Sequence, residues 1–111
     1  MLTHIALFYL KEEQAGQTKA ENREQIINNV QSLKKNIPQI NNIIIADKFE
    51  TPKVSFPAAD LCVYVTFKTQ QDYEEYFHHP IHQKAASFAS QVSEKVAGIT
   101  FRENLLEEGD N

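Results

Sequence analysis

The chain has 111 residues, of which 41% are hydrophobic and 23% are charged, and its formal net charge is −4 at pH 7. This size and composition indicate one folded domain and exclude disordered, collagen-like and coiled-coil classes. The acidic balance argues against a nucleic-acid partner. The apolar stretches are much shorter than the roughly 20 residues that cross a bilayer, so we expect no membrane partner and a cytoplasmic location.

The first two expected elements are a strand over 2–10 and a helix over 19–36. Alternating residues of the strand place four side chains on one side, namely His4, Ala6, Phe8 and Leu10. Thr18 and Glu21 form a capping-box pattern that starts the helix, and Pro38 follows its end.

Two further strands are expected in the middle of the chain. The isoleucine-rich stretch 42–50 predicts one of them, and 51–59, with its two prolines, predicts a loop. Residues 60–68 alternate clearly and predict the other strand. Cys62, the single cysteine, lies within that strand and is expected to be a buried, inert thiol.

The last part of the chain predicts a broken helix and a final strand. Thr69 is the expected N-cap of a short helix, which Pro80 interrupts near residue 79. Past the proline, apolar residues at helical spacing predict that the helix continues to Gly98. The last strand is then expected at 99–103.

This order of elements is βαββαβ, which indicates an α+β, ferredoxin-like subunit. Its four-stranded antiparallel sheet would carry both helical connections on one face. The domain would occupy 1–104, followed by an acidic C-terminal tail at 105–111. Strands 2–10 and 60–68 have large apolar residues on both sides, so we predict a homodimer in which two sheets pair into an α/β barrel.

Three of the four histidines lie in one short stretch, YEEYFHHPIHQ at 73–83. Histidine exchanges protons near neutral pH and tyrosine orients a carbonyl or hydroxyl, so this cluster, together with His4, supports acid–base chemistry without a cofactor. A structural alternative is equally open on these residues alone. In it, Pro80 breaks a helix, the flanking histidines cap its ends and the tyrosines are core aromatics.

A metal site is not expected in this stretch. His78, His79 and His82 offer imidazoles, but the HExxH arrangement is missing and Pro80 interrupts the regular i, i+4 geometry. Glycine-rich phosphate and dinucleotide motifs are also missing from the sequence. We therefore expect neither a metal nor a nucleotide cofactor.

Four stretches, LTHIALFYLK, LKKNIPQI, DLCVYVTFKT and DYEEYFHHPIHQ, resemble the stress-responsive α/β-barrel (Dabb) domain over almost the whole chain. The most specific part is Tyr76, three positions before the HPxH element at 79–82, together with His4 near the start of the first strand. This resemblance implies a ferredoxin-like subunit that dimerises into a barrel.

The resemblance also suggests a role for these residues. Members of the family include plant stress proteins and, at a greater distance from this chain, the plant cyclase that makes olivetolic acid. Similarity to that cyclase implies a metal-free pocket in which His82 is the base and Tyr76 and His4 orient a carbonyl. A second pocket tyrosine of the cyclase corresponds to Val30 here, which argues against the same polyketide reaction.

The sequence thus predicts a small organic ligand, hydrophobic or carbonyl-containing, in a cleft between sheet and helices. The candidate catalytic residues are His82, Tyr76 and His4, and the candidate ligand contacts are Phe8, Val30 and His79. The reaction would be cyclase-like or lyase-like. Two alternatives remain: a non-catalytic stress or interaction protein whose histidines are structural, and a cofactor-free monooxygenase-like barrel.

Overall fold

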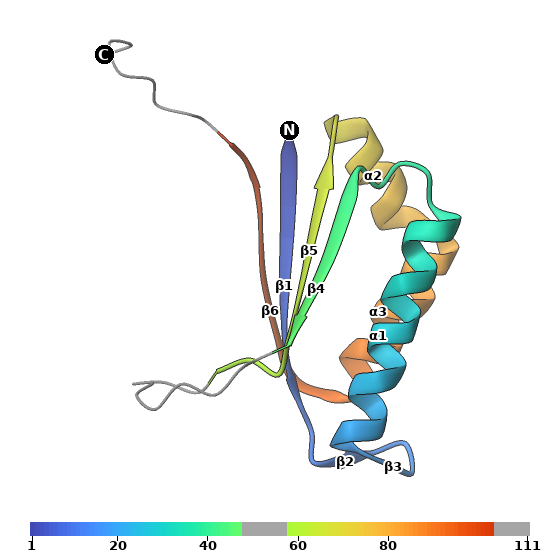
Figure 1. The fold of residues 1–111 in the computed structure, drawn as a ribbon, viewed down its shortest axis with the longest axis vertical. Helices are drawn as coiled ribbons and strands as arrows, with labels where there is room; N and C mark the ends of the chain where they lie inside the picture. Colours follow the sequence, from blue (N-terminus) through green and yellow to red (C-terminus); the bar gives the residue numbers. More distant parts are fainter. Residues whose placement is uncertain (48–57, 104–111) are drawn as a thin grey trace.

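The computed structural model describes residues 1–47 and 58–103, and Figure 1 shows its ribbon. The main elements are β1 (Leu2–Leu10), α1 (Lys19–Asn36), β4 (Asn42–Asp47), β5 (Leu61–Phe67), α2 (Gln70–His78), α3 (Pro80–Gln91) and β6 (Ser93–Arg102). Two very short strands, β2 (Glu13–Gln14) and β3 (Gln17–Thr18), precede α1. Most of the loop expected at 51–59, the end of the strand expected at 42–50 and the tail expected at 105–111 lie outside the described residues, so the domain boundary stays a prediction.

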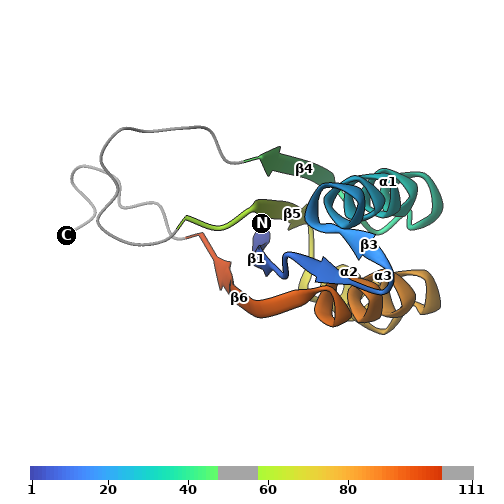
Figure 2. The ribbon, with the colours of Figure 1, turned by 90° about the horizontal axis from the view of Figure 1, so that it is seen from below.

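Four of the strands form one antiparallel sheet in the order β4-β5-β1-β6. The helices α1, α2 and α3 lie together on one side of this sheet, as Figure 2 shows. The predicted α+β, ferredoxin-like arrangement is therefore confirmed. Within the described part of the chain, no helix combines the length and the apolar character that crossing a bilayer requires.

Helix α1 begins where the sequence predicts, because Thr18 and Glu21 close a capping box. Thr18 Oγ1 accepts a hydrogen bond from the Glu21 backbone N–H at 3.2 Å, and the Glu21 carboxylate accepts one from the Thr18 backbone N–H at 3.0 Å. After the helix, the Lys34 ammonium donates to the carbonyl oxygens of Ile40 and Asn41 at 3.2 and 2.9 Å. These bonds fix the turn that leads into β4.

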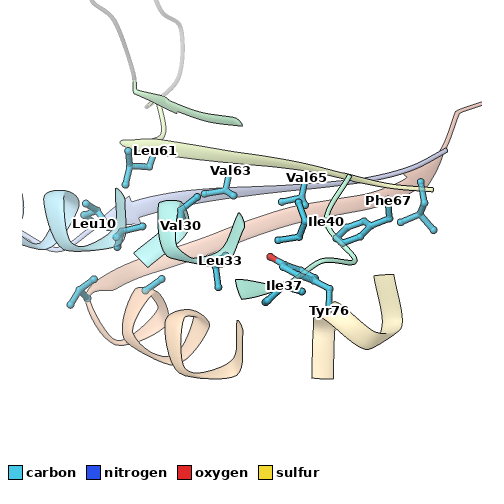
Figure 3. Close-up of a cluster of buried hydrophobic side chains, with 14 residues drawn as sticks. Leu10, Val30, Leu33, Ile37, Ile40, Leu61, Val63, Val65, Phe67 and Tyr76 are labelled. Carbon is cyan, nitrogen blue, oxygen red and sulfur yellow. The ribbon is translucent and has the colours of Figure 1, made fainter. Parts of the chain in front are cut away.

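The hydrophobic core lies between the sheet and the helices (Figure 3). Alternate residues of β5 point into it, and Val65 and Phe67 are completely buried there. Ile26 and Leu33 from α1 and Ile37 just after it meet this face. Burying one such side chain stabilises a fold by about 1.5–3 kcal/mol. The core therefore holds the helices against one defined face of the sheet.

The helix after Pro80 is shorter than the sequence predicts. The expected helix reached Gly98, but α3 ends at Gln91 and β6 begins at Ser93. Val92 and Val96 fit the spacing of the apolar stripe on α3, and this spacing caused the wrong prediction. The hydrogen bonds to β1 instead hold the residues from Ser93 onward in an extended strand.

The hairpin of β2 and β3 has no counterpart among the expected elements. Its two connecting residues, Ala15 and Gly16, both have positive φ angles of 56° and 74°, the conformation of a type I′ turn. The buried Asn22 of α1 donates from Nδ2 to the Gln14 carbonyl at 3.0 Å. This hydrogen bond attaches the hairpin to the first turns of α1.

The face of the sheet opposite the helices is apolar. Ile44 and Ile99 are 50% and 58% exposed there, and Ile5 pairs directly with Ile99. Cys62 also points to this face and is only half-buried, which corrects the expectation of a buried thiol. The reason is the alternation of β5, whose core-facing residues are the neighbours of Cys62 in the chain.

Replacing Thr18 with alanine is expected to lower the free energy of unfolding by about 1 kcal/mol, the usual cost of losing an N-cap. The physical reason is the loss of the acceptor for the Glu21 N–H. Urea unfolding followed by circular dichroism measures the change. Ser87→Ala, at an exposed position within α3, is the matched control and should change the stability much less. Equal stability of Thr18→Ala and the wild type would contradict the prediction.

Candidate functional site

A cavity of about 290 Å³ lies between the sheet and the helix layer. It is lined by His4, Ala6, Phe8, Ile26, Asn29, Val30, Leu33, Val63, Tyr76, Phe77, His82, Ala85, Ala86, Ala89, Ser90 and Val96. Five of the six site residues predicted from the sequence are among these, and the sixth, His79, is not. The structure thus brings together side chains from β1, α1, α2 and α3.

The orientation of His82 follows from the break between α2 and α3. Its Nδ1 lies 3.1 Å from the Phe77 carbonyl oxygen, and the Gln83 side-chain amide donates to the same oxygen. A carbonyl oxygen only accepts hydrogen bonds, so His82 Nδ1 carries the hydrogen. In the neutral ring, Nε2 therefore keeps its lone pair and can take up a proton.

Burial keeps this ring neutral. Desolvation lowers the pKa of His82, the hydrogen bond to Phe77 opposes that shift, and the nearby His79 adds a smaller lowering effect. The net direction is down from the ordinary value of 6.5. At pH 7 His82 is therefore an uncharged base.

His79 caps a helix and does not line the cavity, which corrects the prediction that it contacts the ligand there. Its Nδ1 accepts a hydrogen bond from the Ile81 backbone N–H at 3.1 Å, so it is the N-cap of α3. Pro80 occupies the first position of that helix, where a missing N–H costs nothing. The ring is committed to the helix start and does not line the cavity.

Tyr76 comes from the last turn of α2 and packs its ring between the sheet and His82. Its ring centroid lies 4.2 Å from that of His82 and 4.9 Å from that of Phe67. Figure 3 shows the Tyr76 ring reaching into the layer between the helices and the sheet. Desolvation, together with the nearby Tyr73, raises the pKa of Tyr76 strongly, so its hydroxyl stays protonated and can donate a hydrogen bond.

His4 reaches the cavity from β1. Its Nδ1 lies 2.6 Å from Thr100 Oγ1 on the neighbouring strand β6, and its ring packs 5.9 Å from that of Tyr73. Burial lowers the pKa of His4, and the electrostatic effect of His82 lowers it further. Because both pKa values are lowered, both imidazoles are neutral at pH 7.

Several cavity residues were not among the sequence predictions. Three alanines of α3, Ala85, Ala86 and Ala89, line the cavity, and Asn29 and Ser90 add polar groups to its lining. The closely spaced alanines were a usable signal, because small side chains on a core-facing helix leave space beside them. Asn29 and Ser90 had no distinguishing pattern in the sequence.

The model of the stress-responsive A/B barrel domain family, Dabb, matches residues 2–102 of the chain. The chain belongs to the Dabb family. The family resemblance indicated by the sequence motifs is thus confirmed, whereas the distant similarity to olivetolic acid cyclase stays a prediction. No curated protein matches the sequence significantly.

Solved structures similar to this Dabb chain share its fold at low sequence identity. A hydroxynitrile lyase from Passiflora edulis has a TM-score of 0.80 and 16% identity, with 96% of each chain covered. The Arabidopsis thaliana protein At3g17210 has a TM-score of 0.79 and 18% identity, covering 97% of this chain and 100% of that one. A dimeric protein of unknown function with a ferredoxin-like fold from Bacteroides fragilis has a TM-score of 0.70 and 20% identity, covering 92% and 95%. Likeness at these identities shows the fold alone.

Potential metal ligands do not converge in the described part of this Dabb chain: no three His, Cys, Asp or Glu side chains there are placed to hold an ion. Three titratable side chains, His4, Tyr76 and His82, line the cavity together. Their arrangement suits proton transfer and hydrogen bonding to a bound molecule.

The stability of the protein is expected to fall as the pH is lowered through about 6.5, the ordinary pKa of histidine. Folding lowers the pKa of both His4 and His82. Below the ordinary value, the unfolded chain therefore binds protons that the folded chain does not. The loss stops once the pH is below both folded-state pKa values.

Urea unfolding at a series of pH values between about 7.5 and 5 tests this expectation. The double variant His4→Gln, His82→Gln should show a smaller fall in the free energy of unfolding over that range than the wild type. The single variant His78→Gln, at an exposed position, is the control and should retain the wild-type dependence. Stability that rises on acidification in this range would contradict the direction of both pKa shifts.

Proposed function

We propose that this Dabb protein binds a small apolar molecule bearing a carbonyl group and catalyses a proton-transfer step on it without a cofactor. One observation carries the proposal: three titratable side chains from separate elements, His4, Tyr76 and His82, line one cavity with largely apolar walls. Such a combination of an apolar pocket and a few polar groups with shifted pKa values is typical of ligand and active sites.

His82 is the general base of the proposed reaction. The Phe77 carbonyl holds Nδ1–H, which leaves the Nε2 lone pair free, and the lowered pKa keeps the ring uncharged at pH 7. Nε2 takes a proton from the carbon next to the ligand carbonyl, and the electron pair of that C–H bond moves onto the carbonyl oxygen as an enolate. The same ring returns the proton at the end of the reaction.

Tyr76 stabilises the oxygen that gains charge in this step. Its hydroxyl is protonated because burial raises the pKa, so it donates a hydrogen bond to the enolate oxygen. His4, held by Thr100 on β6, orients the same carbonyl group. The enolate carbon can then attack a second carbonyl in an aldol-type step, or the reverse reaction can cleave such a bond as a lyase does.

The family and the fold support this proposal without specifying the reaction. The hydroxynitrile lyase from Passiflora edulis has the same fold, so the fold hosts a lyase in that protein. The shared architecture is not by itself a shared activity. The reaction class proposed for this chain therefore rests on its own His82 and Tyr76. The cytoplasmic location of the protein also stays a prediction.

We also propose that the protein is a homodimer that pairs the uncovered faces of two sheets into a barrel. Ile44 and Ile99 are half exposed on this face, and an exposed apolar surface of this kind on a small domain usually marks an interface. Solved structures of the same fold from Bacteroides fragilis and Thermobifida fusca are described as dimeric.

The proposed chemistry predicts that the protein accelerates exchange of the hydrogens next to the carbonyl of 2-decanone in D₂O, followed by proton NMR. His82→Gln is expected to lower the exchange rate by about 10²–10⁴, the usual contribution of a general base. Tyr76→Phe is expected to lower it by about 10²–10³, the usual loss for one oxyanion donor. His78→Gln is the matched control, because this histidine is exposed and does not line the cavity.

The opposite result would assign the cluster a structural role. If the wild type did not accelerate the exchange, the catalytic part of the proposal would fail. If His82→Gln and Tyr76→Phe lowered the melting temperature but left the exchange rate of 2-decanone unchanged, both residues would be structural. The non-catalytic stress or interaction protein would then be the better description.

Replacing Ile99 with lysine is expected to convert the dimer into a monomer, because the charge would be buried in the apolar sheet interface. Size-exclusion chromatography with light scattering at micromolar concentration measures the mass. Ile81→Lys, at an exposed position on the helix layer, is the matched control and should stay dimeric. A wild-type protein that runs as a monomer would refute the proposed interface.

A further inference from the structure

Helices α1 and α3 run side by side, as Figure 2 shows. Residues of both helices and of the β2–β3 hairpin line a second hollow. It is a groove of about 730 Å³. It is lined by Ala15, Gln17, Gln25, Asn29, Ser32, Ile81, Lys84, Ala85 and Phe88. The groove therefore combines an apolar floor with amide, hydroxyl and ammonium groups that donate hydrogen bonds.

This groove lies directly behind the cavity of the proposed active site. Asn29 of α1 and Ala85 of α3 line both hollows, so the cavity and the groove adjoin at these two residues. Asn29 is held by Gln25, whose Nε2 donates to Asn29 Oδ1 at 2.9 Å, and Ala85 contributes a single methyl group.

Lys84 determines the charge of the groove. It follows His82 by two residues on α3, which places the two side chains about 200° apart around the helix, one toward the cavity and one toward the groove. Among the described residues that line the groove, Lys84 is the only ionisable one. Its ammonium forms no ion pair with any residue that the structure describes.

The surroundings of Lys84 contrast with the rest of the chain. The protein has 15 Asp and Glu residues and a net charge of −4, so its overall charge disfavours the approach of an anion. The lining of this groove, within the described residues, includes none of those carboxylates. An anionic group placed here meets one unpaired cation and the donor groups of Gln17, Gln25 and Ser32.

We propose that the ligand is an oxo acid that occupies both hollows, with its carbonyl at His82 and Tyr76 and its carboxylate at Lys84. This inference rests on the proposed function and adds the substrate class to it. The apolar middle of the molecule lies beside Asn29 and Ala85, where the two hollows adjoin. The carbonyl end reaches the base in the cavity while the carboxylate stays hydrated in the groove, where its charge needs little desolvation.

Calorimetric titration with two matched probes, 2-decanone and 9-oxodecanoate, tests this inference. The second probe differs from the first in having a carboxylate in place of the terminal methyl group. The wild type should bind 9-oxodecanoate more tightly than 2-decanone. Lys84→Gln should weaken binding of 9-oxodecanoate by about two- to fivefold, as expected for one partly exposed ion pair, and leave binding of 2-decanone unchanged.

A matched variant and a salt series make the test specific. Lys35→Gln removes an exposed lysine of α1 that does not line the groove, and it should change neither affinity. Added salt should weaken binding of 9-oxodecanoate and leave binding of 2-decanone unaffected, because ions screen exposed charges.

The outcomes separate this inference from the proposed function. If 2-decanone binds but the carboxylate adds no affinity, or if Lys84→Gln weakens both probes equally, the oxo acid inference is wrong while the carbonyl site stands. If neither probe binds the wild type, the proposed function fails and the inference fails with it. If Lys84→Gln weakens binding of 9-oxodecanoate but not of 2-decanone, and Lys35→Gln weakens neither, the oxo acid inference is supported.

Discussion

The helix break at His79 and Pro80 is the constraint on which the candidate site depends. In a continuous helix the Phe77 carbonyl would accept from the N–H of Ile81, but that N–H is bonded to the His79 ring at the helix break. The carbonyl is therefore open to His82 Nδ1. One break in a helix thus gives two neighbouring histidines different roles, a cap for His79 and an oriented base for His82.

The sequence indicated most of the residues of this site but not the role of each one. His4, Phe8, Val30, Tyr76 and His82 line one cavity, and strand alternation and helical spacing are enough to place residues on these faces. A capping role for the histidines beside Pro80 was predicted as the structural alternative, but HHPIH alone does not reveal that the His79 ring accepts from the Ile81 N–H. A binding role for Lys84 could not be predicted either, since an exposed lysine on a helix gives no signal until the groove beside it is known.

The fold was predictable where local signals were strong. The capping box at Thr18, the proline after α1 and the alternation of β5 all mark real boundaries. The start of β6 was not predictable, because buried Val92 ends α3 and also fits its apolar stripe. The β2–β3 hairpin was not predicted for another reason. Its strands have two residues each, which is too few to show any periodicity.

The place of β1 in the sheet has a consequence for the order of assembly. β1 is the first strand of the chain and lies between β5 and β6, so His4 has Val65 on one side and Thr100 on the other. Contacts this distant in sequence slow folding, since long loops must close first. During synthesis β1 leaves the ribosome long before its partners, and His4 gains Thr100 only after nearly the whole chain has been made.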